Sequence, residues 1–265
     1  MQAHRFGRAA NRLLVFVLYL FLLAPVFPVI MMSFTNDTFV MFPPESWGVR
    51  WYFAIWHNTA FQDALWVSVF VGMVTTAVAI LVGVPAAYAI VRLPLPGRQF
   101  LLGLFTAPLI VPTIILGLGL LLVLVRIEMR GTYLGLIVAH SVLVVPYMIR
   151  IVATGLTTLP SDVEAAAATL GAPPLKVFRH VTMPLLSPAI LGAAGLCFLV
   201  SFDEVAVSLF IVGTKISTLP VTIFRYTQDH TDPQIAVVSV LLILISALFI
   251  IALERTVGLM RAIGQ

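Results

Sequence analysis

Charged residues are scarce in this sequence, and their scarcity excludes a soluble domain. They make up 10% of the 265 residues, whereas hydrophobic residues make up 61%. Soluble domains carry about 25% charged residues. The net charge of +4 does not indicate nucleic-acid binding, because most of the basic residues flank apolar runs, as they do on the cytoplasmic side of membrane proteins.

Cysteine is scarce as well, and metal-binding clusters and phosphate-binding loops are lacking. The single cysteine, Cys197, lies in an apolar run and can form no intrachain disulfide, so we expect it to be a packing residue. The sequence has no Cys/His cluster with metal-ligand spacing and no glycine-rich phosphate loop. We therefore expect no catalytic residue, metal or cofactor in this chain. If ATP is used, another chain binds it.

Long apolar runs are what the sequence contains instead. The first, a 22-residue run at residues 13–34, would extend about 33 Å as a helix, which is enough to cross a bilayer. The predicted spans are residues 13–34, 64–91, 100–125, 133–149, 185–212 and 235–253. They predict an all-α membrane protein with a single transmembrane domain over residues 1–265. A cleaved signal peptide is the alternative for the first run, but no small-x-small cleavage site closes it.

Lysine and arginine are distributed unevenly between the two sides of these spans. The N-terminal arm, the connector after the second span, the segment between the fourth and fifth spans and the tail carry 10, whereas the remaining loops carry 5. Six spans place both termini on one side, so the positive-inside rule predicts that both termini are cytoplasmic. Residues 35–61, on the outer side, are rich in aromatic residues. They predict an interfacial helix or a surface that meets a solute-binding protein.

The predicted cytoplasmic loop at residues 159–184 tolerates more polar residues than any other segment. Ser161 and Glu164 have the spacing of a capping box, which predicts a helix start at Ser161. Gly171 can adopt a positive φ and end this helix. Pro173 and Pro174 favour the first turn of a second helix, which is expected to stop before Pro184.

These residues resemble the EAA loop of the inner-membrane permease subunits of bacterial ATP-binding-cassette importers. Gly171, Val181, Met183 and Pro184 match the family pattern, whereas the acid, Glu164, stands one residue earlier than the family register expects. The resemblance implies a MetI-like permease fold whose cytoplasmic helix pair docks into a cleft on the ATPase subunit. The alternative is an ordinary helical hairpin between membrane spans. The coupling residues that the resemblance implies are Glu164, Ala165, Ala166, Leu170, Gly171, Ala172, Phe178 and Pro184.

The resemblance also implies the partners of the chain. They are a second permease subunit in a heterodimer, two ATPase subunits that bind ATP, and an extracytoplasmic solute-binding protein, assembled in the bacterial inner (plasma) membrane. Segments near residues 201–213, 218–224 and 232–243 are similar to permeases of the polyamine, opine, thiamine and phosphonate branch. They imply spermidine or putrescine as cargo, with 2-aminoethylphosphonate or another small amine as the alternative.

Two adjacent acids interrupt the fifth predicted span. Carboxylates are costly in hydrocarbon unless they face water or a partner, so Asp203 and Glu204 are candidates for the substrate pathway. Helical neighbours point about 100° apart, so only one of them is expected to line it. The structural alternative is that they pair with arginine or cap a helix break. His140, alone in the fourth span, is expected to bond a neighbouring helix rather than to carry protons.

Two other classes of protein would explain fewer of these sequence features. An ion-coupled secondary transporter would explain the acids and His140, but it would not explain the loop in which glycine joins two helices. An intramembrane protease needs a serine in a Gly-x-Ser-x-Gly-like turn with a histidine partner, and neither Ser141 nor Ser201 has that context.

Overall fold

The computed structural model describes the backbone of residues 2–257 and the side chains of residues 11–255. The basic side chains expected at Arg5, Arg8 and Arg261 therefore lie outside the described residues. Among the described residues there is no strand, and only an isolated bridge joins Thr35 to Trp47. The chain divides into two compact units. Of the described residues, one unit contains residues 2–61 together with Arg225–Ile245, and the other contains Gln62–Phe224 and residues 246–257.

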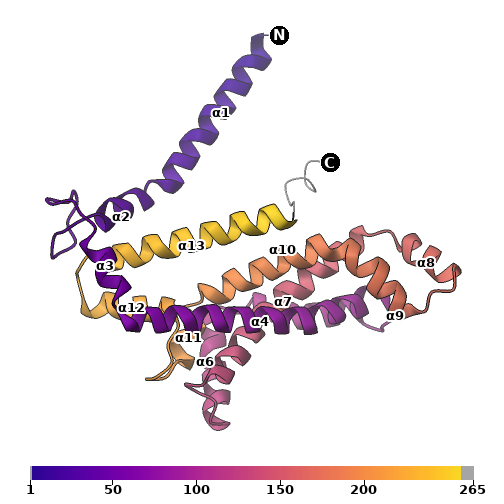
Figure 1. Cartoon of the computed structure of the whole chain (residues 1–265). Coiled ribbons are helices and arrows are strands. Elements are labelled where there is room, and N and C mark those ends of the chain that lie inside the picture. Colours follow the sequence, from indigo (N-terminus) through magenta and orange to yellow (C-terminus); the bar gives the residue numbers. More distant parts are fainter. Residues whose placement is uncertain (1, 258–265) are drawn as a thin grey trace. The chain divides into compact units, whose positions relative to one another are not determined.

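The first unit begins with a bent helix pair. Helix α1 (Gln2–Leu23) is followed by α2 (Val26–Ser33), and the pair bends by 47°. The bend occurs at Pro25, the residue before α2, because proline lacks the N–H that a continuous helix needs there. The short helix α3 (Arg50–Trp56) then lies in the aromatic segment where a helix was predicted (Figure 1). Helices α12 (Leu219–Asp229) and α13 (Gln234–Val257) continue from one unit into the other.

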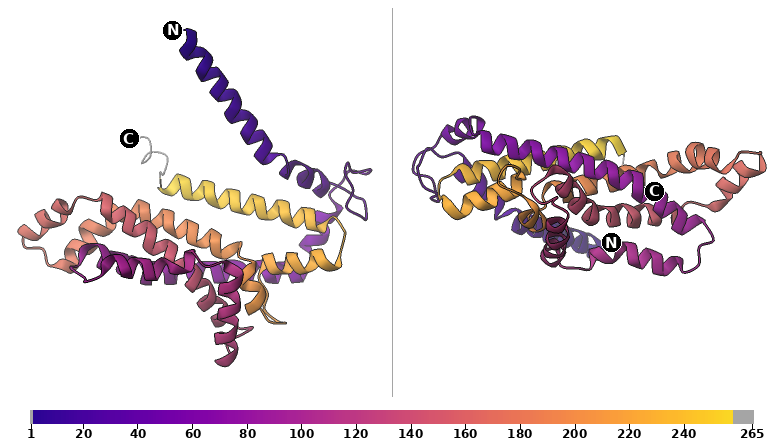
Figure 2. Two further views of the ribbon diagram at one scale, coloured as in Figure 1. Left: turned by 180° about the vertical axis from the view of Figure 1, so that it is seen from behind. Right: turned by 90° about the horizontal axis from the view of Figure 1, so that it is seen from below.

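The second unit is built on three long helices that lie side by side, α4 (Thr59–Arg92), α7 (Tyr133–Thr158) and α10 (Met183–Phe202) (Figure 2). Their facing side chains form a core that includes Ala87, Val144 and Ala193, each fully buried. Helix α4 approaches α7 closely at Gly83. A Cβ atom there would lie 2.7 Å from Cγ of Met148, so only glycine permits this approach.

In the part of the chain that the structure describes, the predicted spans correspond to four single helices and two bent pairs that are long and apolar enough to cross a membrane. The all-α membrane fold is therefore confirmed. The third predicted span differs most from expectation, because α5 (Arg98–Thr106) with η1 (Ala107–Leu109) meets α6 (Thr113–Arg126) at an angle of 94°. Pro108 within η1 and Pro112 just before α6 explain the break, since neither can donate a helical hydrogen bond.

The fourth and fifth predicted spans also have different ends. Helix α7 continues to Thr158, well beyond the predicted end at residue 149. The fifth span is not one helix, because α10 ends at Phe202 and α11 (Ala206–Ile211) begins after a short break. The acids Asp203 and Glu204 lie in that break.

Candidate coupling site

The loop predicted to contact an ATPase is a helical hairpin at one end of the second unit (Figure 1). Its first helix, α8 (Ser161–Thr169), ends as predicted at Gly171, whose φ is 83°. The Gly171 N–H donates to the Ala168 carbonyl at 2.9 Å, and the Ala172 N–H donates to the Ala167 carbonyl at 3.2 Å. This pair of bonds is a Schellman motif, which satisfies two carbonyls that the helix end would otherwise leave unpaired.

The predicted capping box at the start of α8 is wrong. The residue before α8 is Pro160, and no side chain caps the helix end. Glu164 cannot return to the cap because its carboxylate is bonded elsewhere. Its Oε2 lies 2.8 Å from Nε of Arg92, and its Oε1 accepts a hydrogen bond of 2.7 Å from the Thr182 hydroxyl.

The predicted end of the second helix before Pro184 is also wrong. The helix starts as α9 (Pro174–Val177), continues through a π-helical turn, η2 (Phe178–Thr182), and runs directly into α10. In a regular helix, the ring of Pro184 would meet the carbonyl four residues earlier. The wider π turn lies over that position, so the chain passes the proline without ending the helix.

Helix α4 contacts the hairpin at two points one helical turn apart. The ring of Tyr88 meets the ring of Phe178 edge to face, with centroids 4.8 Å apart. Arg92, the last residue of α4, forms the ion pair with Glu164 and also donates from Nη2 to the carbonyl of Leu159 at 2.9 Å. Leu159 is the C-cap of α7. The Arg92 and Glu164 side chains are only 15% and 13% exposed.

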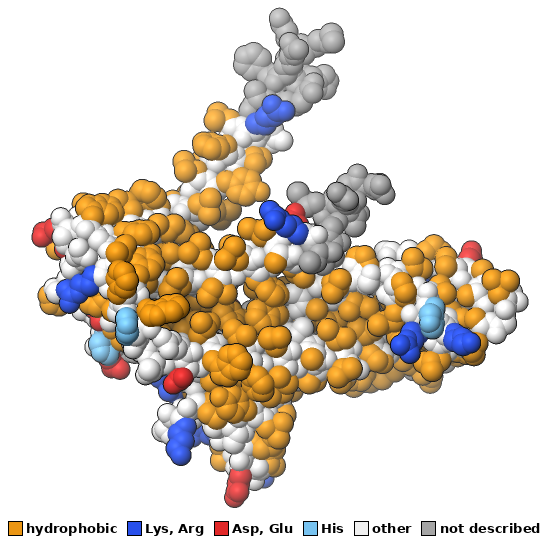
Figure 3. All heavy atoms as spheres, viewed as in Figure 1, with side chains coloured by type: hydrophobic (Ala, Val, Ile, Leu, Met, Phe, Trp, Pro, Cys, Tyr) orange, Lys and Arg blue, Asp and Glu red, His pale blue; other side chains and the backbone are white. Residues whose placement is uncertain are grey.

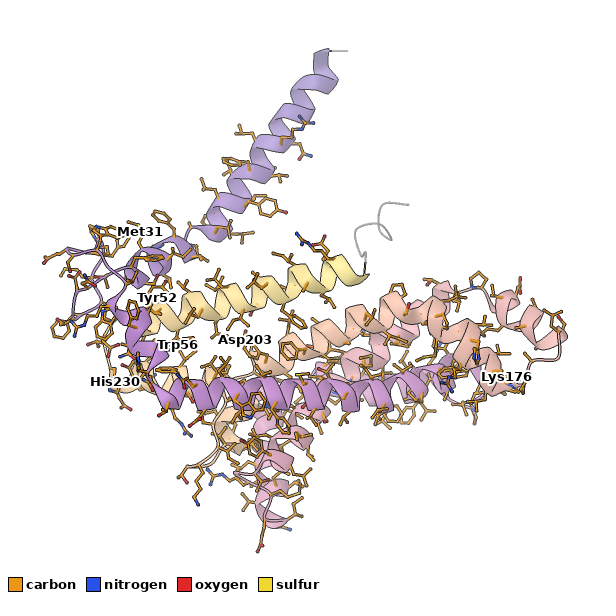
Figure 4. All side chains as sticks on the ribbon, viewed as in Figure 1. Met31, Tyr52, Trp56, Lys176, Asp203 and His230 are labelled. Carbon is orange, nitrogen blue, oxygen red and sulfur yellow. The ribbon has the colours of Figure 1, made fainter. Side chains whose placement is uncertain are left out.

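The tip of the hairpin is apolar and exposed. Leu170 is 89% exposed beside Gly171, and Leu175 on the following helix is 77% exposed. Basic side chains gather on the outer face of the same hairpin (Figure 3), and Lys176 is seen on α9 (Figure 4).

The structure separates the predicted coupling residues into two groups. The exposed members lie on α8, at the tip or at the start of α10, and the less exposed members face α4 or the turn. The exposed group is Ala165, Ala166, Leu170, Gly171 and Pro184, and the less exposed group is Glu164, Ala172 and Phe178. Arg92 and Thr182 belong to this site but were not predicted. No local pattern in the sequence joins either residue to Glu164.

The two acids of the predicted pathway have different local roles. Asp203 is the C-cap of α10, and its side chain is exposed (Figure 4). Glu204 accepts a 2.9 Å hydrogen bond at Oε1 from the backbone N–H of Val207 in the first turn of α11. Glu204, which precedes the N-cap residue Val205, therefore satisfies one backbone N–H in the first turn of α11, a local role in line with the structural alternative considered for this position.

His140 bonds neighbouring helices, as predicted. It is fully buried in α7, and its ring nitrogens lie 2.8 Å from the hydroxyls of Ser201 in α10 and Ser208 in α11. A neutral imidazole has one donor and one acceptor nitrogen, so one serine accepts while the other donates. The histidine thus links the two helices across the break that contains the acids.

The sequence is similar to those of importer permeases over most of its length. It is 31% identical to the putative 2-aminoethylphosphonate transport system permease protein PhnV of Salmonella typhimurium, over 94% of both chains. It is 30% identical to the putrescine transport system permease protein PotI of Escherichia coli K12, over 89% of this chain and 86% of PotI.

Solved structures support the same fold. A chain of a bacterial ABC transporter that imports the acidic polysaccharide alginate matches with a TM-score of 0.71, at 15% identity, over 97% of both chains. A chain of the MetNI methionine ABC transporter in an inward-facing conformation matches with a TM-score of 0.64, at 20% identity, over 77% of this chain and 96% of that one. At these identities the likeness shows the fold alone, which is the predicted MetI-like permease fold.

Residues 79–260 match the family described as the binding-protein-dependent transport system inner membrane component. This match includes the hairpin, Arg92, His140 and the helix break. Members of this family are transport components rather than enzymes. The chain belongs to this family of inner-membrane permeases of binding-protein-dependent ABC importers.

Proposed function

We propose that this chain is a pore-forming permease subunit of an importer for polyamines, driven by ATP hydrolysis on separate ATPase subunits. It pairs with a sister permease, and an extracytoplasmic binding protein delivers the solute. The hairpin around Gly171 contacts the ATPase. The observation that carries this proposal is the exposed tip at Leu170, on a hairpin joined to three membrane helices.

The exposed tip supports docking because of its chemistry. Leu170 is 89% exposed at the turn, so covering it with a partner removes apolar surface from water and makes the free energy of binding more favourable. The Schellman motif sets the direction of the chain at the tip, so little conformational entropy is lost on docking. Closure of the ATPase pair then moves the hairpin as a rigid body and switches the pore between inward-facing and outward-facing states.

The orientation follows from the charge distribution. The hairpin and the connector after α4 are both rich in basic residues, and both are cytoplasmic under the positive-inside rule. Both termini lie on the same side as the hairpin if each bent helix pair crosses the membrane once. An ATPase in the cytoplasm then reaches the tip.

The cargo assignment rests on the relatives. PotI is named as a putrescine permease and PhnV as a putative 2-aminoethylphosphonate permease, and the two are almost equally similar to this chain. Both solutes carry a primary amine, which is cationic at neutral pH. Polyamines are the first assignment because of Asp203, a carboxylate in the break of the fifth span. Its negative charge attracts a polyamine cation, whereas it would repel the phosphonate group of 2-aminoethylphosphonate. 2-Aminoethylphosphonate is the second.

The test is uptake by cells that lack this gene. Labelled putrescine, spermidine and 2-aminoethylphosphonate are supplied separately, and the deletion is complemented with the wild type, Gly171→Pro or Asp203→Asn. We expect polyamine uptake to return only with the wild type and, at a reduced rate, with Asp203→Asn. Gly171→Pro should reach the membrane at a normal level and still fail. Normal uptake by Gly171→Pro would contradict the coupling role, whereas rescue of phosphonate uptake alone would change the cargo.

A further inference from the structure

The attachment of α8 to the rest of the unit depends on polar contacts. None of the residues of α8 is buried, although the helix packs against α9 and η2. Burial of apolar side chains therefore does little to fix this helix. Glu164 is the charged residue of α8 that is partly buried, and its carboxylate oxygens have separate partners, Arg92 on α4 and Thr182 on η2.

Arg92 is suited to join several elements because its guanidinium has donors in a fixed, planar arrangement. Nε lies 2.8 Å from the Glu164 carboxylate in an ion pair without hydrogen-bond geometry, while Nη2 donates a hydrogen bond of 2.9 Å to the Leu159 carbonyl at the end of α7. A single side chain at the end of α4 therefore contacts both α7 and α8. With both side chains about 85% covered, this pair is screened by salt less than an ion pair on an open surface.

Thr182 extends the same set of contacts to α10. It is fully buried in the π turn, and its hydroxyl donates to the second oxygen of Glu164. The π turn is part of a continuous helical segment from Pro174 to Phe202, which leads to the break at Asp203. A displacement of α8 is thus opposed at once by the ends of α4 and α7 and by the start of α10.

We propose that Arg92 is a positioning residue for energy coupling: with Glu164 and Thr182 it ties the coupling hairpin to α4, α7 and α10, so that movement of the hairpin moves these membrane helices. This inference rests on the proposed function of the hairpin. Without the ion pair, α8 follows the ATPase while α4 stays behind. ATP is then hydrolysed without a matching import of solute.

The experiment compares variants in the complete importer, purified with its ATPase subunits and reconstituted with the solute-binding protein. Glu164→Gln removes the ion pair with almost no change of size, whereas Arg92→Gln removes it together with the hydrogen bond to Leu159 and shortens the side chain. Arg98→Gln and Asp162→Asn are the matched controls, because Arg98 begins α5 just after the connector that follows Arg92 and Asp162 lies in the same helical turn as Glu164, and both are exposed. Three quantities are measured: the ATPase subunit retained, the rate of ATP hydrolysis and the solute imported per ATP.

We expect Arg92→Gln and Glu164→Gln to retain the ATPase subunit and to hydrolyse ATP. Solute imported per ATP should fall by about two- to thirtyfold, the range that single side chains along a coupling path produce. The controls should match the wild type. The exchanged pair Arg92→Glu/Glu164→Arg should restore part of the ratio, and Arg92→Lys should lie between wild type and Arg92→Gln, because lysine keeps the charge without the second fixed donor.

A normal ratio of solute to ATP in Arg92→Gln would overturn the inference. So would loss of the ATPase subunit from that variant, since Arg92 would then act in docking. If Arg92→Gln fails to fold, Thr182→Val removes only one hydroxyl and should still lower the ratio, and an unchanged ratio would again overturn the inference. Failure of the proposed function looks different: in that case Leu170→Asp at the tip would leave ATPase retention and uptake unchanged.

Discussion

Gly171 offers a sharp test of the hairpin, because its role can be separated from packing. Its φ of 83° is a backbone conformation that side chains other than glycine rarely adopt, yet a Cβ atom there would meet nothing within 4 Å. Gly171→Ala therefore adds strain to the backbone without a steric clash. The left-handed conformation costs an ordinary residue about 1–2 kcal/mol. Asparagine adopts it more readily, so Gly171→Asn should cost less.

This cost predicts how strongly the ATPase binds. Strain of about 1.4 kcal/mol lowers the population of the native turn about tenfold, unless the rest of the hairpin holds it. We expect Gly171→Ala to weaken binding of the ATPase subunit by up to about tenfold and Gly171→Asn to weaken it less. Binding is measured by titrating the purified ATPase onto the permease in nanodiscs. Solute uptake should follow the same order of variants.

Gly97 supplies the matched control. It also has a positive φ, of 68°, and a Cβ atom there would likewise meet nothing within 4 Å, but it lies in the connector before α5. Gly97→Ala should carry a similar strain and leave ATPase binding unchanged. Equal weakening by both variants, or none by Gly171→Ala, would refute the reasoning that the shape of this turn controls docking.

Three further predictions concern other parts of the chain. His140→Leu leaves two buried serine hydroxyls without their partner, so it should lower the free energy of unfolding by about 1–2 kcal/mol. The thermal unfolding temperature in detergent should therefore fall, and an unchanged temperature would contradict this. Gly83→Ala places a Cβ atom 2.7 Å from Met148 and should cost about 1–3 kcal/mol by the same measurement, whereas Gly103→Ala, with open space at its Cβ, should be neutral. Hydrogen bonds from Ser46 and then Thr35 lower the pKa of Asp37, so they stabilise the loop before α3 above about pH 4, and this stabilisation is lost as the pH falls through the lowered pKa. Fluorescence of Trp51, whose indole N–H donates to the Asp37 carbonyl, should report that loss in a variant with no other tryptophan, and a change near neutral pH would contradict it.

The sequence predicted those features that depend on local chemistry. Apolar length was enough for α4, because residues 64–91 lie inside the observed helix, and Gly171 ends α8 because only a residue tolerant of positive φ fits there. The effects of the prolines could not be predicted in the same way. The helix pair around Pro25 bends by 47° and the pair around Pro112 by 94°, whereas the π turn lets the helix continue through Pro184. How a chain passes a proline depends on its tertiary neighbours, which a local pattern does not contain.

The polar groups of the unit could be found in the sequence, but their partners could not. His140 was expected to bond a neighbouring helix, yet nothing local identifies Ser201 and Ser208 as the residues it contacts. The spacing of Ser161 and Glu164 predicted a capping box, but Glu164 instead pairs with Arg92. An ion pair with less exposure to water and a hydrogen bond from a buried threonine outweigh a cap at an exposed helix end.

The position of Glu164, one residue earlier than the family register expects, is consistent with this inward pairing. One residue turns a side chain by about 100° around a helix, so an acid at position 165 would point away from Arg92. The structure has alanine there instead, and Ala165 and Ala166 are exposed. The α8 surface beside Leu170 therefore carries small, uncharged side chains, while the Glu164 carboxylate is turned toward the membrane helices. Docking at the tip should therefore depend mainly on apolar burial, whereas transmission of movement to the membrane helices should depend on the ion pair. Substitutions at Leu170 should mainly weaken ATPase binding, and substitutions at Arg92 should mainly lower the amount of solute imported per ATP.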